Sequence, residues 1–299
     1  MTKKKQFWVL AAAILSHIFW GFSFMASRVA LDVAHTFLLL SHRFLLAFLV
    51  MSLLPLTGLV KLDLKGKPLL PLIALGMAEP VIYFFGEQYG ILHSTTIFSG
   101  VMIAMIPIVS TVAAAPLLGE RPTTGQLLFS LLSVGGVIGL GLMNSSQGKL
   151  DWIGVAALVV AVIAAGAYTL LGRGISKKFT PFERSYAMLG VGAFVFTILA
   201  LVHCRGSVTA YLQPLSQQPY LLAILFLSLI CSVVSYFCSA YTITYLSVAR
   251  HTVFVNLTTA VSVFAGAVFL HEPLSWVGLL CCLAILLGIY GVQRTARDR

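Results

Sequence analysis

Two glutamates and one tyrosine share a single apolar stretch of this 299-residue chain. Glu79, Tyr83 and Glu87 follow one another at four-residue intervals, so a helix through residues 69–91 would present all three on one face. A carboxylate as deep in a membrane as Glu79 must face a cavity, meet a cation or be protonated. The stripe therefore predicts a site for a cationic or amino-bearing ligand, with Glu79 as a candidate proton carrier.

Both glutamates also have simpler interpretations. Pro80 has no N–H, so a neutral Glu79 could cap the carbonyl group that Pro80 leaves free. Glu87 lies about two helical turns nearer the outer surface, where a solvated vestibule could hold it. Spacing alone leaves these alternatives open.

A second stripe, of ring side chains, lies on the first apolar stretch, residues 7–29. His17, Trp20 and Phe24 share one helix face by i, i+3, i+7 spacing. Trp20 lies near the middle of the stretch, whereas tryptophans of a membrane-interface belt lie at its ends. The stripe is therefore a candidate wall of the same cavity, with helix packing as the alternative. His17 titrates near neutral pH if hydrated, so it competes with Glu79 as the protonatable group, unless it is a neutral imidazole hydrogen-bonded to a neighbouring helix.

Arg43 lies inside the second apolar stretch, seven residues from its outer end. At the rise of an α-helix this places it roughly 10 Å deep. Its guanidinium could snorkel outward, form a structural ion pair with Glu87 or Glu79, or bind a substrate carboxylate. Further candidates for the cavity wall are Tyr168, Tyr236 and Asn256, and the candidates for coupling or gating are Glu79, Glu87, Arg43, Pro107 and Arg250.

The sequence lacks the patterns that enzymatic or metal-dependent chemistry would need. It has no G-x-x-x-x-G-K-[ST], H-E-x-x-H or G-x-S-x-G pattern and no clustered pair of aspartates. Its five cysteines show neither C-x-x-C nor metal-ligand spacing. We therefore expect no catalytic residues, no bound metal, no cofactor and no direct use of ATP.

The composition excludes a soluble protein. Only 9% of the residues are charged, 59% are hydrophobic and the mean hydropathy is +0.99, whereas a soluble domain carries about 25% charged residues. Runs of about 20 apolar residues predict membrane-spanning helices. The ten predicted stretches are 7–29, 36–57, 69–91, 95–118, 124–143, 151–172, 181–203, 219–242, 248–270 and 275–292. The surroundings of such a chain are membrane lipids.

Small residues predict close contacts between helices. Gly135 and Gly139 form a G-x-x-x-G pattern, and Ala161 with Ala165 mimics it. We therefore expect the fifth and sixth stretches to pack together.

The distribution of cations predicts the orientation. With a cytoplasmic N-terminus, 15 of the 19 lysines and arginines fall in inner segments, as the positive-inside rule requires. Arg28, Lys149 and Arg205 fall outside, and Arg43 lies within a span. Both termini are therefore predicted to face the cytoplasm, and topology explains the net charge of +10 without a nucleic-acid partner.

The two halves of the chain, 1–148 and 149–299, carry traces of an internal repeat. Adding 152 to residue numbers in the fourth stretch maps Glu120 onto Glu272. Five spans in each half give the halves opposite orientations. An inverted repeat of this kind is typical of secondary transporters, whose substrate sites lie near the bilayer midplane.

The order of several short motifs resembles the EamA-type branch of the drug/metabolite transporter superfamily. These motifs are Trp20-Gly21, His42-Arg43-Phe44, Tyr89-Gly90, Ser94-Thr95, Pro107, Leu118-Gly119-Glu120-Arg121 and Leu270-His271-Glu272-Pro273. The resemblance implies an all-α integral membrane protein with ten transmembrane helices in two inverted five-helix repeats. It also implies export of amino acids, related metabolites or toxic compounds. The second half departs from the pattern at Thr259, which replaces the proline of the fourth helix.

Residues and resemblance together favour a secondary-active exporter of small metabolites that works by alternating access. A proton or concentration gradient would drive it. A passive channel, a lipid scramblase and a membrane-embedded enzyme are the alternatives, and the repeat favours transport over them. The short loops suit a multi-pass protein of the bacterial inner membrane, as a monomer or a homodimer, with a small-molecule substrate, lipids and protons as its partners.

Overall fold

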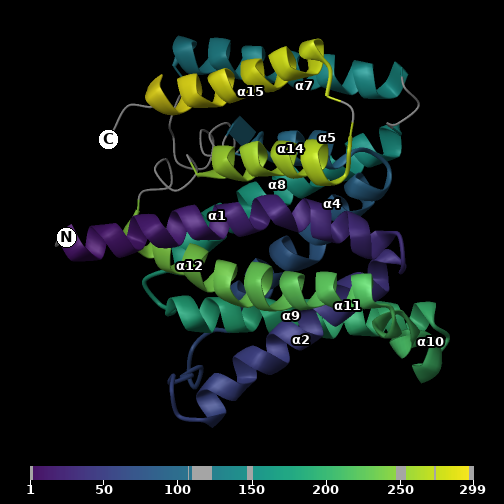
Figure 1. Ribbon diagram of the computed structural model, residues 1–299. Coiled ribbons are helices and arrows are strands. Elements are labelled where there is room, and N and C mark those ends of the chain that lie inside the picture. Colours follow the sequence, from purple (N-terminus) through teal and green to yellow (C-terminus); the bar gives the residue numbers. More distant parts are fainter. Residues whose placement is uncertain are drawn as a thin grey trace.

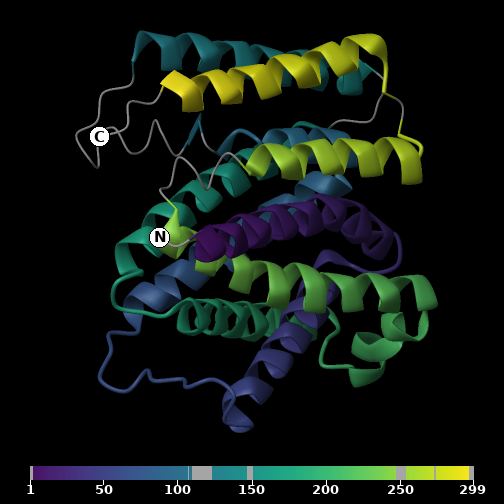
Figure 2. The same cartoon turned by 60° about the vertical axis from the view of Figure 1, so that its left-hand side comes forward.

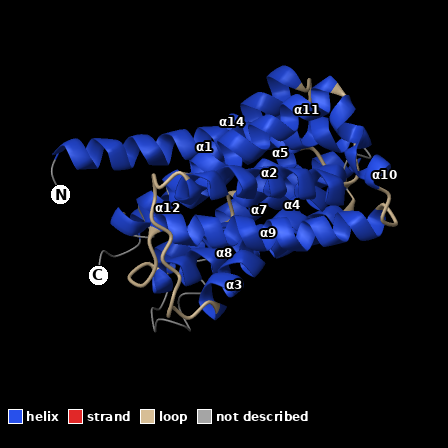
Figure 3. Ribbon diagram, turned by 90° about the horizontal axis from the view of Figure 1, so that it is seen from below, coloured by secondary structure: helices blue, strands red, loops and turns tan. Residues whose placement is uncertain are grey.

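The computed structural model describes residues 3–106, 108–109, 123–146, 151–246, 254–272 and 274–295. These residues form helices and connecting turns, with no strand among them (Figure 3). Up to residue 146 the elements are α1 (Lys3–Leu31), α2 (Thr36–Leu56), α3 (Leu70–Gly76), η1 (Met77–Ile82), α4 (Tyr83–Leu92), α5 (Thr96–Ile103) and α7 (Thr124–Ser146). Later elements are α8 (Trp152–Ile175), α9 (Pro181–His203), α10 (Val208–Leu212), η2 (Gln213–Ser216), α11 (Gln218–Leu225), η3 (Phe226–Val234), α12 (Ser235–Tyr245), α14 (Val255–Phe269) and α15 (Trp276–Thr295).

Among the described residues, six segments are long and apolar enough to cross a membrane. They are Lys5–Leu31, Thr36–Leu56, Leu70–Leu92, Trp152–Ile175, Pro181–His203 and Gln218–Tyr245. Shorter apolar helices cover Leu128–Leu140, Leu257–Phe269 and Trp276–Gly288. The chain is therefore built as a multi-pass membrane protein, as its composition predicts. Each of the ten predicted stretches overlaps a described helix, while the count of ten spans and their orientation stay predictions.

Two of the long segments are interrupted at π-helical turns, and each interruption has a local cause. In the segment Leu70–Leu92, Pro80 has no N–H and Glu79 has non-helical backbone angles (φ −145°, ψ 117°) within η1. In the segment that contains η3, Ser232 and Ser235 donate hydroxyl hydrogen bonds to carbonyl groups five residues back. The first break puts Glu79 at a bend in the middle of a helix, and transporters build their sites from discontinuous helices of this kind.

The helices run side by side between two ends of the bundle (Figures 1 and 2). Lys3 and Thr295 lie at one end, which we call the proximal end; the turns at residues 32–35, 93–95 and 204–207 lie at the other, which we call the distal end. α2 packs along α9, α4 along α8, α1 against α12 and α14, and α5 against α14. α7 and α15 pair with each other in a layer at the top of both views.

Small residues set the closest contacts between α7 and α15. A Cβ on Gly136 would lie 2.7 Å from Ile285 Cγ1 and 2.8 Å from the Cys281 carbonyl oxygen, both on α15. Gly139 also faces Cys281, whereas a Cβ on Gly135 would meet nothing within 4 Å. The G-x-x-x-G pattern predicted that the fifth and sixth stretches, which are α7 and α8, pack together. This prediction is wrong, because α7 packs against α15 and α8 packs against α4. Of the two glycines of the pattern, Gly139 lies at a helix contact and Gly135 does not. Adjacent helix positions face about 100° apart, so a pattern shifted by one residue points at a different neighbour.

Two adjacent alanine substitutions test this register. Gly136→Ala is expected to destabilise the pair of helices by about 1 to 3 kcal/mol, because the new methyl group meets both side chain and backbone of α15. Gly135→Ala is expected to be neutral or to stabilise by up to about 1 kcal/mol, because its methyl group meets nothing and alanine favours a helix. Apparent melting temperatures in detergent should separate the two variants. Equal shifts would contradict the register.

Candidate functional site

One cavity in the middle of the bundle collects the aromatic and acidic residues that the sequence predicts for a site. Its empty space is about 670 Å³, counting the part that is open to solvent. The lining residues are His17, Trp20, Ser23, Phe24, Glu79, Tyr83, Phe84, Glu87, Ile103, Ile106, Ala165, Tyr168, Thr169, Tyr236, Ser239, Val255 and Thr258. They come from both halves of the chain, so the cavity exists only when α1, η1, α4 and α5 meet α8, α12 and α14.

Two buried carboxylates face this cavity, and each accepts a hydrogen bond from a tyrosine. Glu79 is 7% exposed, and its carboxylate accepts from the Tyr236 hydroxyl at 2.5 Å. Glu87 is 3% exposed and accepts from the Tyr83 hydroxyl at 2.7 Å and from Gln88 Nε2 at 2.8 Å. Glu87 is therefore a buried residue of the cavity and not the solvated vestibule residue that its sequence position allows.

Arg43 lies behind one wall of the cavity and is fully buried (0% exposed). Its Nε donates to Ser232 Oγ at 3.0 Å, and its guanidinium carbon lies 4.3 Å from the ring centroid of the cavity-lining Phe84. Nη1 and Nη2 have no hydrogen-bond partner among the described residues. The guanidinium interacts electrostatically with both carboxylates, although neither comes within the 4.0 Å of an ion pair. Arg43 therefore does not snorkel to the surface, and it compensates the negative charge of the cavity from inside the bundle.

Ring side chains of α1 form another part of the wall. Trp20 donates from Nε1 to the Cys231 carbonyl oxygen at 3.0 Å, and its ring centroid lies 5.4 Å from that of Tyr236. His17 Nδ1 lies 2.9 Å from Thr258 Oγ1 of α14. This is the arrangement expected of an imidazole that is hydrogen-bonded to a neighbouring helix. The two hydrogen bonds fix α1 to η3 and to α14, which orients its aromatic stripe.

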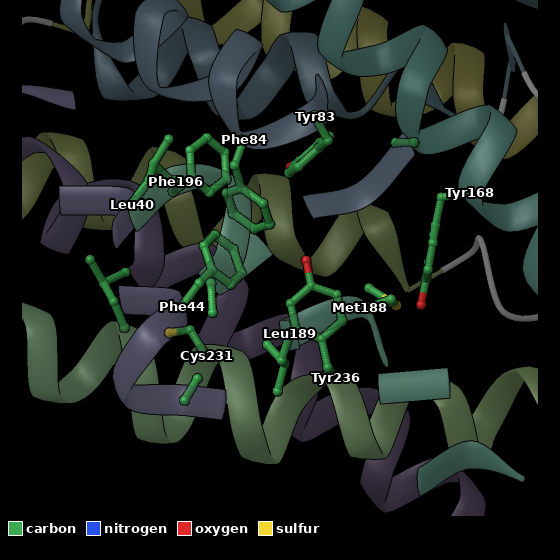
Figure 4. Packing of buried hydrophobic residues seen from close by; sticks show 14 of the residues in the cluster. Leu40, Phe44, Tyr83, Phe84, Tyr168, Met188, Leu189, Phe196, Cys231 and Tyr236 are labelled. Atoms are coloured by element: carbon green, nitrogen blue, oxygen red, sulfur yellow. The ribbon is translucent and has the colours of Figure 1, made fainter. Parts of the chain in front are cut away.

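Three tyrosines approach the same space from different helices: Tyr83 from α4, Tyr168 from α8 and Tyr236 from α12 (Figure 4). They place hydroxyl groups and ring faces around the carboxylates. Aromatic faces and carboxylates both attract organic cations. Across the part of the chain that the structure describes, no three His, Cys, Asp or Glu side chains come together as metal ligands. The arrangement is therefore suited to binding an amine.

A model of the EamA-like transporter family matches this chain over residues 7–142 and 152–294. The chain belongs to the EamA-like transporter family. It is 32% identical to the uncharacterized transporter YcxC of Bacillus subtilis, over 97% of this chain and 94% of that protein. It is also 29% identical to a probable terminal-alkyne amino-acid exporter of Streptantibioticus cattleyicolor, over 98% of this chain and 94% of that protein.

The fold of this EamA-like transporter also occurs in a solved structure. A protein crystal structure superposes on it with a TM-score of 0.69, covers 95% of each chain and is 15% identical in sequence. The matched length shows that the similarity extends through both halves of the bundle.

Three residues predicted for the site of this EamA-like transporter are not placed by the structure. Pro107 and Arg250 lie outside the described residues, and Asn256 is described only as backbone in the first turn of α14. Two residues of α14 that line the cavity, Val255 and Thr258, were not predicted to do so.

Ser23 is another lining residue that was not predicted. It lies three residues beyond Trp20, so helical spacing places it near the predicted aromatic stripe. Serine and threonine often make hydrogen bonds between membrane helices, so their position in a sequence does not distinguish packing from a site.

The Tyr236 hydroxyl can be removed without its ring. Tyr236→Phe keeps the aromatic contact with Trp20 and deletes the hydrogen bond to Glu79. A hydrogen bond to a charged group contributes about 1.5 to 3 kcal/mol, so we expect at least about a tenfold loss in transport at low substrate concentration. Tyr241→Phe is the matched control, because that ring contacts Tyr245 and does not line the cavity. Equal effects of the two substitutions would contradict this assignment.

Proposed function

We propose that this transporter is a secondary-active exporter of small amino-bearing metabolites, which works by alternating access and exchanges its substrate for protons. The observation that carries the proposal is the pair of buried carboxylates, Glu79 and Glu87, beside the buried Arg43. Ionisable groups inside a membrane protein are costly, and they mark substrate and proton pathways.

Charge balance supports the exchange. With both carboxylates ionised, the Arg43 guanidinium compensates one of them, and one negative charge remains in a buried cluster. A proton or a substrate ammonium group can neutralise this remaining charge, and the two compete for it. Such competition makes the binding of one reduce the affinity for the other, which is the coupling that exchange requires.

We assign the exchanging proton to Glu79. Glu87 accepts two hydrogen bonds, from Tyr83 and Gln88 of its own helix. Glu79 accepts from Tyr236 of another helix, and it lies at the break in its own. A group that joins two helices at a bend can be bonded in one arrangement of the helices and released in another, and Glu79 meets that condition.

The cavity wall supports amino-bearing compounds with an apolar or aromatic part as substrates. Trp20, Tyr83 and Tyr168 offer ring surfaces next to the carboxylates, and such surfaces favour cationic and aromatic groups. The name of one relative, a probable amino-acid exporter, supports the same class. Candidate substrates are therefore amino acids, related metabolites and drugs that carry an amine.

Helix pairing supports ten spans in two inverted repeats, residues 1–148 and 149–299. In that arrangement α1, α2, α4, α5 and α7 correspond to α8, α9, α12, α14 and α15. Three of the packed pairs, α2–α9, α5–α14 and α7–α15, are each formed by two corresponding helices. Two other pairs are related by the repeat: replacing each helix of the pair α1–α12 by its counterpart gives the pair α8–α4. With both termini in the cytoplasm of a bacterium, the distal end would face outward across the inner membrane. The transporting unit would be a monomer, alone or within a homodimer.

A solute counterflow assay tests this function. Purified protein would be placed in liposomes loaded with a pool of amino acids and organic cations, and each labelled compound would be added outside. We expect at least one labelled amino-bearing compound to accumulate inside the liposomes without a pH gradient, and to accumulate faster when a pH gradient is imposed. Movement of labelled lipid between leaflets with no movement of solute would contradict the proposal and would favour a scramblase.

A further inference from the structure

The carboxylate of Glu272 joins two helices at the distal end of the bundle. Its Oε1 accepts from the backbone N–H of Thr96 at 2.7 Å, and its Oε2 accepts from the N–H of Ile97 at 2.9 Å. Thr95 supplies the other N-terminal bonds of α5, since its Oγ1 accepts from the Phe98 N–H at 3.1 Å. Two of these three side-chain bonds to the N-terminus of α5 therefore come from a residue that follows α14, far along the chain. The first N–H groups of a helix need partners and favour a negative charge.

Glu272 itself is fixed to the end of α14. Its own N–H donates to the Gly266 carbonyl oxygen at 3.0 Å, so the chain folds back onto the last turns of that helix. A Cβ on Gly266 would lie 2.9 Å from Glu272 Oε2 and 2.9 Å from Ile97 Cγ1. The carboxylate therefore belongs to α14 as a rigid part, and its two bonds to α5 are contacts between separate helices.

The same two helices are in close contact nearer the centre of the bundle. Thr259 Oγ1 donates to the Gly100 carbonyl oxygen at 3.1 Å, and a Cβ on Gly100 would lie 2.7 Å from Ser262 Cβ. Beyond this contact Ile103 of α5 and Val255 of α14 line the cavity. The seam between α5 and α14 therefore runs from the distal end of the bundle to the wall of the cavity.

We propose that Glu272 is the latch of a distal gate: its carboxylate holds α5 against α14, and release of its two hydrogen bonds opens the cavity toward the distal side. The inference rests on the proposed function, because a gate has meaning only for a protein that passes a solute. Glu272 is partly exposed. When the seam opens, water can therefore form hydrogen bonds with its carboxylate and with the two backbone N–H groups that it leaves. Release is therefore reversible.

Distances between two spin labels test the latch independently of transport. The labels would replace Leu92, the last residue of α4 and four residues before the start of α5, and Val268, in the last turn of α14; both are exposed. The five native cysteines would first be replaced by alanine. In liposomes we expect Glu272→Gln to raise the ratio of long to short distances about tenfold, because it removes the charge from two charge-assisted hydrogen bonds.

Thr95→Ala is the matched control. It weakens the N-terminus of α5 by removing the bond to Phe98, but it leaves the bonds between α5 and α14 in place. We expect the ratio of long to short distances in Thr95→Ala to stay within about twofold of that in the unchanged chain. If Glu272 acted only by capping α5, Thr95→Ala and Glu272→Gln should instead shift this ratio equally. Equal distance ratios in Glu272→Gln and the unchanged chain, or equal shifts in both variants, would overturn the latch. Counterflow by the unchanged chain separates the two proposals. A distance shift without any counterflow would show that Glu272 holds α5 against α14, but it would overturn the transport function and with it the role of this contact as a gate.

Discussion

Replacing Glu79 by glutamine is expected to abolish the acceleration of transport by a pH gradient. Glutamine has nearly the same shape and can still accept a hydrogen bond from Tyr236, but it cannot take up or release a proton. Loss of a charged partner for the substrate amine costs about 1.5 to 3 kcal/mol, so gradient-driven flux should fall at least about tenfold. The measurement is labelled-substrate flux in proteoliposomes at several imposed pH differences.

Glu87→Gln is the control for this substitution. Glu87 faces the same cavity but is held by Tyr83 and Gln88 within its own helix. We expect this variant to bind the substrate amine more weakly and to keep its response to the pH gradient. If the Glu79 variant kept the full pH response, or if only the Glu87 variant lost it, Glu79 would not be the proton carrier.

Removal of the Arg43 charge is expected to have the largest effect on stability. Arg43→Gln leaves two buried carboxylates without a compensating cation. Breaking a close buried ion pair costs about 3 to 5 kcal/mol, and this value is the upper limit here because neither carboxylate lies within ion-pair distance of Arg43. The apparent melting temperature in detergent should fall, and transport should fall with it. Arg173→Gln is the control, because that arginine is exposed in the last turn of α8, where a substitution changes stability by about 0.5 kcal/mol or less.

A second substitution shows whether charge is the cause. Glu87→Gln in the Arg43→Gln background removes one of the two carboxylates and should restore part of the lost stability. The double-mutant cycle should then give a coupling of about 1 kcal/mol or more. Additive losses from the two substitutions would show that Arg43 acts through packing against Phe84 and not through charge.

Helical spacing was sufficient to predict which side chains share a surface. The stripe of Glu79, Tyr83 and Glu87 and the stripe that begins with His17 and Trp20 both line the one cavity. His17 and Trp20 lie within α1, and Tyr83 and Glu87 lie within α4, so the geometry of each pair depends only on the period of its helix. Glu79 lies at the break that precedes α4 and still faces the same cavity. The bend at Glu79 could also be anticipated, because Pro80 lacks the N–H that a continuous helix would use.

Contacts between helices could not be predicted in the same way. The partner of Glu79 is Tyr236, 157 residues later, and the partners of Glu272 are backbone amides of α5. Nothing in local spacing selects these pairs, because they depend on which helices become neighbours. The predicted contact of Gly135 and Gly139 with the sixth stretch failed for the same reason, because Gly136 and Gly139 face α15. An ion pair with Glu87 or Glu79 was one of three interpretations of Arg43 that the sequence left open, whereas its side chain packs on Phe84 and acts on the carboxylates at longer range.

The exchange of an amine for a proton is tested most directly by the pH inside sealed proteoliposomes. A pH-sensitive dye would be enclosed with no pH gradient imposed, and a substrate found by counterflow would be added outside. Entry of the substrate should drive protons out and make the interior more alkaline, and Glu79→Gln should abolish this change. Substrate entry with no change of internal pH in the unchanged protein would contradict the account, because the remaining charge of the cavity would then not pass between amine and proton.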